Sequence, residues 1–259
     1  MGIVSAQSYS ILRFMLKYFN NVFELFGCYN ICMNKFTFTT SGILGEAWEL
    51  FKKRPVFLIF FVVLYSVLGN ISSGVNDKNT EASIFSLIIS LISGVLSVIV
   101  GAGFTKSMIR YVRGDYHQIQ IFDLFSVLNM KTLLHYFAYS LILSIATFIG
   151  FIFFIIPGFY ILITYGFGTF LIIDKNISFM DAARLSSVMT SGIKMQIFML
   201  GIVSVGVLFL GMLALILGIF VALPVVFLAG VLLYVKAVKF YESAASENKT
   251  IEPELVTQI

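Results

Sequence analysis

Long apolar segments alternate with short polar ones along the chain, and one stretch shows the pattern most clearly. Residues 149–173 are almost entirely apolar and are interrupted at Pro157 and Gly158, after which Asp174 leads into an amphipathic segment that ends near Ile193. Apolar runs of this kind predict membrane-spanning helices, because a hydrocarbon core of roughly 30 Å needs about 20 apolar residues per crossing. The interruption predicts a helical hairpin, and an amphipathic helix follows it.

Similar units occur on both sides of this stretch. The predicted crossings are residues 55–71, 84–104, 133–173 (two crossings with their turn), 196–219 and 224–240. In the last hairpin, Gly218 and Pro224 occupy positions that correspond to Gly150 and Pro157 of the preceding hairpin. The pattern predicts an all-α polytopic membrane protein with six transmembrane helices, built as three repeats of an amphipathic helix and a helical hairpin.

Three amphipathic segments, residues 43–53, 121–128 and 178–193, precede or follow the hairpins. In the third, Ser178 is followed three residues later by Asp181, which is a capping-box signature for a helix start. Apolar residues then recur at helical spacing on one face, namely Ala182, Leu185, Met189 and Ile193. This segment predicts a helix with one buried and one polar face.

The polar side of the third segment holds the candidate site residues. Arg184, Ser186 and Ser187 would contact a lipid headgroup or a protein partner in one interpretation. In the other, the helix docks on the bundle at the interface, and Arg184 forms a solvated pair with Asp181. The residue pattern leaves both interpretations open.

The chain divides into three parts. Residues 33–241 form the predicted six-helix transmembrane domain. Residues 1–32 are aromatic-rich and lack a small-residue cleavage site, so they are interpreted as an interfacial helix, or as non-native sequence if translation begins at Met33. Residues 242–259 are polar and acidic, and we expect this tail to be disordered.

Composition and charge agree with a membrane environment. Hydrophobic residues make up 59% of the chain and charged residues 12%, and the mean hydropathy is +0.98. Of the 17 Lys and Arg residues, all but Lys78 lie on the side that holds both predicted termini, which predicts cytoplasmic termini. The net charge of +4 indicates attraction to anionic lipid, with no nucleic-acid partner, since the basic residues sit at helix ends.

The predicted crossings offer little for catalysis or metal binding. No Asp, Glu, Lys or Arg falls in the middle of a predicted crossing, although such residues mark proton relays and intramembrane active sites. Cys28 and Cys32 lie four residues apart without a nearby histidine, and two ligands do not close a zinc site. We therefore expect no enzyme activity, no metal site, no cofactor and no proton coupling.

Residues 156–192, with the sequence IPGFYILITYGFGTFLIIDKNISFMDAARLSSVMTSG, carry a family resemblance. This stretch resembles the bacterial membrane-domain superfamily that includes the YciC-like proteins and the membrane portion of some glycerophosphodiester phosphodiesterases. There a Pro-Gly hairpin leads to a helix with an Ala-x-x-x-Ser element, matched here by Ala182 to Ser186 or by Ala183 to Ser187. The resemblance implies a bacterial inner-membrane protein, and the hydrolytic activity of the phosphodiesterases does not carry over with it.

Two functional hypotheses follow. The first is a non-enzymatic protein that supports membrane integrity, interacts with lipids or acts as an accessory, with membrane lipids and a membrane-protein partner or a second copy as its partners. The second is a transporter or channel for a neutral or amphipathic solute, indicated by Gly and Pro interruptions at matching places in two hairpins. An enzyme that acts on lipid would need polar catalytic groups, which the crossings do not offer.

Overall fold

The described part of the chain is helical throughout. The structure, a computed structural model, describes residues 38–74, 84–114, 129–153, 155–213 and 217–247, and these contain no strand. The helices are α2 (Thr40–Lys53), α3 (Pro55–Gly74), α4 (Ile84–Arg113), α5 (Met130–Phe153), α6 (Ile155–Tyr165), α7 (Gly168–Lys175), α8 (Phe179–Thr190), α9 (Lys194–Leu213) and α10 (Leu217–Glu247). The predicted all-α class is confirmed.

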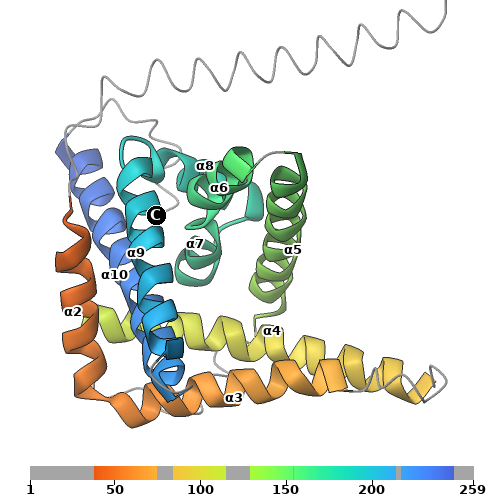
Figure 1. Ribbon diagram of the computed structural model, residues 1–259. Helices are drawn as coiled ribbons and strands as arrows, with labels where there is room; N and C mark the ends of the chain where they lie inside the picture. The colour runs from red at the N-terminus through yellow and green to blue at the C-terminus, as the bar shows by residue number, and fades with distance from the viewer. Residues whose placement is uncertain (1–37, 75–83, 115–128, 154, 214–216, 248–259) are drawn as a thin grey trace, which may run out of the picture.

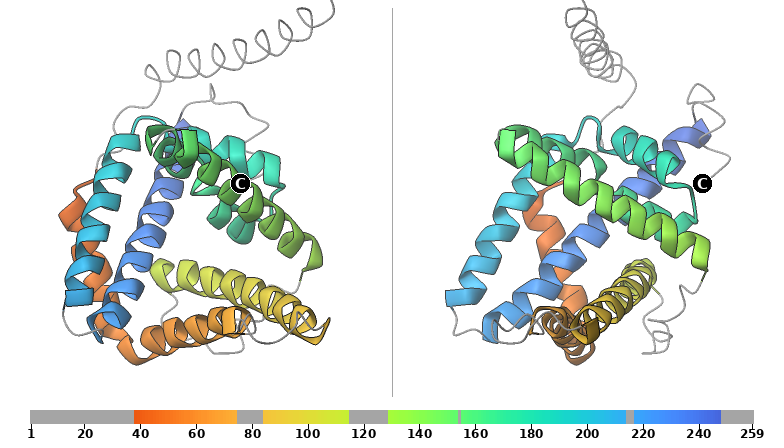
Figure 2. Two further views of the ribbon diagram at one scale, coloured as in Figure 1. Left: turned by 45° about the vertical axis from the view of Figure 1, so that its right-hand side comes forward. Right: turned by 90° about the vertical axis from the view of Figure 1, so that its right-hand side faces the viewer.

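The helices do not form one parallel bundle. Helices α3 and α4 lie side by side and run across the lower part of the view, whereas α2, α9 and α10 stand upright near one end (Figure 1). Helix α5 lies near the other end and runs obliquely (Figure 2). A quarter turn brings α3 and α4 nearly end-on to the viewer (Figure 2). The α3–α4 hairpin therefore crosses α2, α9 and α10 at a steep angle, unlike the three equivalent hairpins that the sequence predicts.

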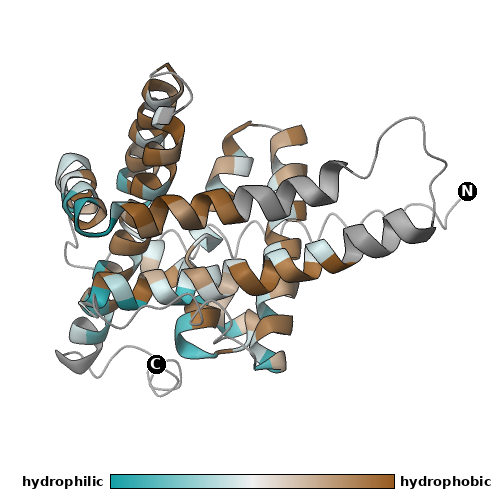
Figure 3. Ribbon diagram, turned by 90° about the horizontal axis from the view of Figure 1, so that it is seen from below, coloured by the Kyte–Doolittle hydropathy of each residue, from teal (hydrophilic) through white to brown (hydrophobic). Residues whose placement is uncertain are grey.

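Five helices in the described ranges are long and apolar enough to cross a membrane. They are Ile92–Arg113, Met130–Phe153, Ile155–Lys175, Lys194–Leu213 and Gly218–Ser243. The described apolar part of α3, Pro55–Leu64, is shorter. Seen from below, the coloured parts of α3 and α4 are mainly hydrophobic (Figure 3). The polytopic character of the prediction is confirmed, while the count of six crossings stays a prediction.

Helix α10 forms the centre of the packing. It lies against α9 and α2 and also contacts α3, α4 and α8. Leu228, Ala229, Val231, Leu233 and Tyr234 are all fully or almost fully buried, so both sides of the helix face protein. A helix that is apolar all round is expected at such an interior position.

The first amphipathic segment folds as predicted and packs against α10. The predicted apolar face of α2, which includes Ala47, is buried. Helix α2 runs alongside α10 (Figure 1), and Lys236 of α10 forms a salt bridge with Glu46 (2.6 Å). Tyr111 of α4 donates a hydrogen bond to the carbonyl of Leu50 (2.8 Å). This helix is therefore part of the packed core.

Two predicted helix ends were placed too early. The polar connection was expected to begin at Lys106, but α4 continues to Arg113 because Met108, Ile109 and Tyr111 pack into the core. The acidic tail was expected to be disordered from residue 242, but α10 continues to Glu247, and Glu242 pairs with Lys175 (2.8 Å). The predictions for residues 1–32, 121–128 and 248–259 lie outside the described residues.

Two of the three predicted hairpins, α5–α6 and α9–α10, have glycines where their helices approach each other. Helix α5 ends at Phe153 and α6 begins at Ile155, so Pro157 and Gly158 lie within the first turn of α6 rather than between the two helices. A Cβ built on Gly150 would lie 2.9 Å from the Cα of Gly158. The two backbones thus approach so closely that only glycine fits.

The second turn lies earlier than the sequence indicated. Helix α9 ends at Leu213 and α10 begins at Leu217. Gly218 is therefore at the start of α10, and Pro224 is inside that helix rather than at a break. A Cβ on Gly211 would lie 2.9 Å from the carbonyl oxygen of Gly218. The structural counterpart of the Gly150–Gly158 contact is therefore Gly211–Gly218, not Gly218 followed by Pro224.

Candidate functional site

The span from Ile155 to Lys175 is not one continuous helix. It ends as α6 at Tyr165 and resumes as α7 at Gly168, with a turn at Gly166 and Phe167. The sequence interpretation placed residues 166–168 within a helix, and this is wrong. A Cβ on Gly166 would lie 2.6 Å from the Leu162 carbonyl oxygen, and one on Gly168 would overlap the Tyr139 hydroxyl. The two glycines permit the break.

A break in an apolar span leaves backbone carbonyls without helical partners, and these must be satisfied inside the protein. Side-chain hydroxyls do this here. Ser186 Oγ donates to the Thr164 carbonyl (2.8 Å), and Thr190 Oγ1 lies 3.2 Å from the same oxygen. Tyr139 donates its hydroxyl to the Tyr165 carbonyl (2.6 Å). Helices α5 and α8 thus cap the end of α6.

Helix α8 packs against α6 and α7, so the predicted docking on the bundle is confirmed, while its position at the membrane interface stays a prediction. Its predicted capping box is present, since the Ser178 hydroxyl accepts from the Asp181 amide (3.4 Å) and donates to the Asp181 carboxylate (2.6 Å). Its predicted apolar face is also confirmed, with Leu185 and Met189 2% and 3% exposed. Helix α8 contacts α5, α6, α7 and α10, and these contacts bury its apolar face.

The start of α9 contacts α6. Lys194, at the start of α9, donates a hydrogen bond to the Tyr160 hydroxyl in α6 (2.9 Å). Its ammonium also lies 4.4 Å from the centre of the Tyr160 ring. Residues 174–195 were expected to stay on one side of the membrane, opposite the α5–α6 turn. The contact places the start of α9 beside the middle of α6, and the side of the membrane on which these residues lie stays a prediction.

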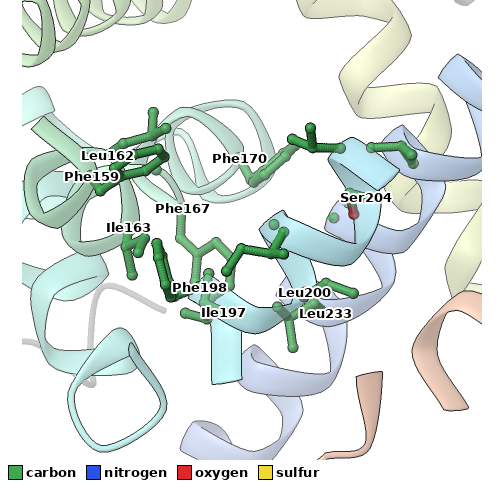
Figure 4. Close-up of a pocket in the computed structure, with 16 residues that line it drawn as sticks. Phe159, Leu162, Ile163, Phe167, Phe170, Ile197, Phe198, Leu200, Ser204 and Leu233 are labelled. Carbon is green, nitrogen blue, oxygen red and sulfur yellow. The ribbon is translucent and has the colours of Figure 1, made fainter. Parts of the chain in front are cut away.

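A large cavity lies beside the break, between α6, α7, α9 and α10. Its volume is about 590 Å³. Figure 4 shows Phe159, Leu162 and Ile163 on one wall, with Phe198, Leu200 and Ser204 of α9 on the other. The remaining lining residues are Gly166, Phe167, Phe170, Ile197, Gly201, Ile202, Val205, Val226, Gly230 and Leu233. Ser204 carries the one polar side chain in this lining, so the cavity suits hydrocarbon.

The large cavity opens toward the exterior of the protein. Leu162 is 44% exposed, Ile202 50% and Val205 66%, although all three line it. Helix α9 as a whole is poorly buried, as is α5, and both present large apolar side chains outward, among them Phe148 and Phe209. Apolar faces of this extent are stable in contact with lipid.

A second cavity of about 430 Å³ lies between α5, α6 and α8. We call it the tyrosine cavity, because Tyr139, Tyr160 and Tyr165 line it together with Phe179. Tyr160 therefore connects the tyrosine cavity with Lys194, and its neighbour Phe159 lines the large cavity. The Phe159 and Phe198 rings meet edge to face, 5.6 Å apart.

A buried ion pair holds the opposite end of α7. Arg113 binds both carboxylate oxygens of Asp174 at 2.6 Å, and Tyr234 donates its hydroxyl to the same carboxylate (2.9 Å). The Asp174 side chain is 6% exposed and that of Arg113 36%. This cluster ties α4, α7 and α10 together. The Arg113 guanidinium and the Tyr234 hydroxyl both donate to the Asp174 carboxylate, which is the arrangement expected of a structural contact.

The structure separates the three predicted site residues. Arg184 is exposed and has no ion-pair partner within the described part of the chain, so the pair with Asp181 is not formed. Ser187 is partly buried. Ser186 is fully buried and caps the Thr164 carbonyl, so it faces the protein interior rather than a headgroup.

Sequence reasoning missed the residues that build the break. Thr164, Tyr139 and Thr190 were treated as ordinary members of apolar or amphipathic helices. Two glycines, Gly166 and Gly168, stand close together inside an apolar run and could have indicated the break. The identity of the capping hydroxyls depends on how α8 folds back, and no spacing in the sequence encodes that.

The fold and the exposed apolar faces define an all-α integral membrane protein. Comparison of the chain with family models, with curated proteins and with solved structures finds no match.

Proposed function

We propose that the protein is a non-enzymatic lipid-binding protein that holds an acyl chain of a membrane lipid in the large cavity. The observation that carries this proposal is the cavity itself, whose lining is apolar apart from Ser204. Its volume of about 590 Å³ falls within the roughly 300–1,000 Å³ typical of ligand pockets. An apolar lining without titratable groups favours binding of hydrocarbon over chemistry on a polar substrate.

Access from the bilayer supports the same proposal. The cavity wall continues to the exterior at Leu162 and Val205, which belong to helices that are long and apolar enough to span the membrane. An acyl chain would therefore enter sideways from the lipid phase, without crossing water. A role in membrane integrity or as an accessory to another membrane protein would follow from such lipid binding.

The membrane placement that we propose is the bacterial inner membrane with the termini in the cytoplasm. Lys175 and Lys236 lie at the same end of the molecule as Arg113, tied there by contacts with Glu242, Glu46 and Asp174. An excess of Lys and Arg marks the cytoplasmic face. The resemblance of residues 156–192 to a bacterial membrane-domain superfamily supports the same placement.

Two glycines on α9 provide a matched test. Gly201 lines the large cavity and Gly206 does not, and a Cβ on either would meet no atom within 4 Å. Leucine at Gly201 would displace about four chain carbons, each contributing about 0.8 kcal/mol, for a loss of about 3 kcal/mol in binding. Leucine at Gly206 would leave the cavity unchanged.

The assay is photocrosslinking of a phosphatidylcholine with a diazirine on its acyl chain, followed by peptide mapping. We expect wild-type protein and Gly206→Leu to crosslink at Phe159, Phe198 and Leu200, and Gly201→Leu to lose these crosslinks. Crosslinks at the exposed Phe148 would persist in all three proteins. Equal crosslinking inside the cavity of Gly201→Leu would refute the proposal.

A transporter for a neutral or amphipathic solute is the second candidate, favoured by the break between α6 and α7. Interrupted helices line substrate sites in several transporter folds. The freed carbonyls at Thr164 and Tyr165 are hydrogen-bonded to protein hydroxyls, however, which makes them poor ion ligands. Proteoliposomes without proton-driven uptake at any pH would agree with this arrangement.

A further inference from the structure

Lys194 lies on the same face of α9 as the first residues of that helix that line the large cavity. Lys194 begins α9, and Ile197 and Phe198, one turn further on, are the first cavity residues on that helix. From Lys194 to Val205, the last cavity residue on α9, the helix rises about 16 Å. The lining on α9 therefore begins one turn after a positive charge and is apolar apart from Ser204.

Contacts with α6 fix the position of this charge. Lys194 donates to the Tyr160 hydroxyl at 2.9 Å, and its nitrogen lies 4.4 Å from the centre of the same ring. Phe159, the residue before Tyr160, lines the large cavity and packs against Phe198. One turn of α6 and one turn of α9 thus contain both the Lys194–Tyr160 contact and part of the cavity wall.

The depth of Lys194 suits a lipid headgroup. Tyr160 lies five residues after Ile155, the first residue of α6, so about 8 Å of helix separates it from the α5–α6 turn. Lysine side chains near the end of a span extend toward the headgroups, and tyrosine is enriched at that depth. A negatively charged group above the cavity would meet this lysine, while its hydrocarbon chain would occupy the cavity below.

We infer that the large cavity selects an anionic amphiphile, with the acyl chain between α6 and α9 and the negative group at Lys194 in the leaflet of the α5–α6 turn. This inference rests on the proposed lipid binding and adds the charge class of the ligand. A phospholipid phosphate and a fatty-acid carboxylate share the required chemistry, and both form charge-assisted hydrogen bonds with an ammonium group.

The experiment measures lipid binding to purified protein in detergent micelles with spin-labelled phosphatidylglycerol, phosphatidylcholine and stearate. A lysine near an anionic lipid contributes a preference of about fivefold. We expect the wild type to prefer phosphatidylglycerol or stearate over phosphatidylcholine by about this factor. Enrichment of phosphatidylglycerol alone would assign the site to a phospholipid, and enrichment of stearate alone to a free fatty acid.

Matched variants separate the charge from the cavity. Lys194→Gln should abolish the preference and leave phosphatidylcholine binding unchanged, and Lys194→Arg should retain the preference. Lys131→Gln is the control, because Lys131 is an exposed lysine near the start of the α5 span and lines neither cavity. Retention of the preference in Lys194→Gln, or equal binding of all three lipids by the wild type, would overturn the inference. Loss of phosphatidylcholine binding in Gly201→Leu would still uphold the proposed function.

Discussion

The capped break between α6 and α7 makes a sharp prediction about two adjacent serines. Ser186 is fully buried and donates to the Thr164 carbonyl at 2.8 Å, whereas Ser187 is partly buried. Replacing Ser186 with alanine removes a hydrogen bond to a buried backbone acceptor. A hydrogen bond of this kind contributes about 1 kcal/mol net, and an acceptor left unsatisfied costs about 1–3 kcal/mol.

The loss of stability in Ser186→Ala depends on Thr190, whose hydroxyl also lies near the Thr164 carbonyl. The Thr190 hydroxyl lies 2.9 Å from the Ser186 carbonyl and 3.2 Å from the Thr164 carbonyl, and it has one proton to donate. When Ser186 is alanine, Thr190 can turn its proton to Thr164, so the single variant should lose about 1 kcal/mol. With Ser186→Ala and Thr190→Val combined, the Thr164 carbonyl loses both donors, and the loss should reach about 3 kcal/mol.

The assay is reversible unfolding of the purified protein in mixed micelles, with Ser187→Ala as the control. A surface-type substitution such as Ser187→Ala should change the free energy of unfolding by less than about 0.5 kcal/mol. The double variant should lose more than the sum of its single variants, with a coupling of about 1 kcal/mol. Additive losses, or a Ser186→Ala effect no larger than that of Ser187→Ala, would show that these hydroxyls do not cap the break.

Three further substitutions test the packing. Gly150→Ala should lower the free energy of unfolding by about 1–3 kcal/mol, because its Cβ would press on Gly158, and an unchanged melting temperature would contradict the close hairpin. Asp174→Asn should lower the free energy of unfolding by about 2 kcal/mol in the same assay. This value lies between those of exposed and buried ion pairs, because Arg113 is partly exposed. Wild-type stability of this variant would show that the ion pair does not stabilise the fold. Leu185→Glu would bury a carboxylate at a cost of several kcal/mol and should reduce the amount of protein in the membrane, and normal accumulation would mean that α8 does not pack as described.

Local patterns in the sequence predicted helix type and buried faces well. The Ser178–Asp181 capping box and the apolar face that includes Leu185 both follow from spacing along one helix, and the structure contains both. The buried face of α2 was predicted in the same way. These features depend on helical periodicity, which is visible without knowledge of neighbouring helices.

Features that depend on contacts between helices were not predictable from one sequence. In lipid, apolar side chains gain little by moving from one apolar neighbour to another, so hydropathy does not indicate which faces meet. The turn before Leu217 was therefore placed near Gly218 and Pro224, and the steep crossing of α3 and α4 was missed. The sequence left Ser186 as a candidate headgroup or partner contact, and its carbonyl partner, Thr164, lies on another helix and is not visible from spacing.

The central claim, that the large cavity holds one lipid chain, is tested most directly by native mass spectrometry of protein released from detergent micelles. Gly201 and Gly230 line the cavity from α9 and α10, and leucine at both would fill it from two sides without backbone overlap. We predict that the wild type and Gly206→Leu each retain one lipid per chain, and that the Gly201→Leu and Gly230→Leu double variant retains none. A double variant that remains folded and keeps its lipid would contradict the claim.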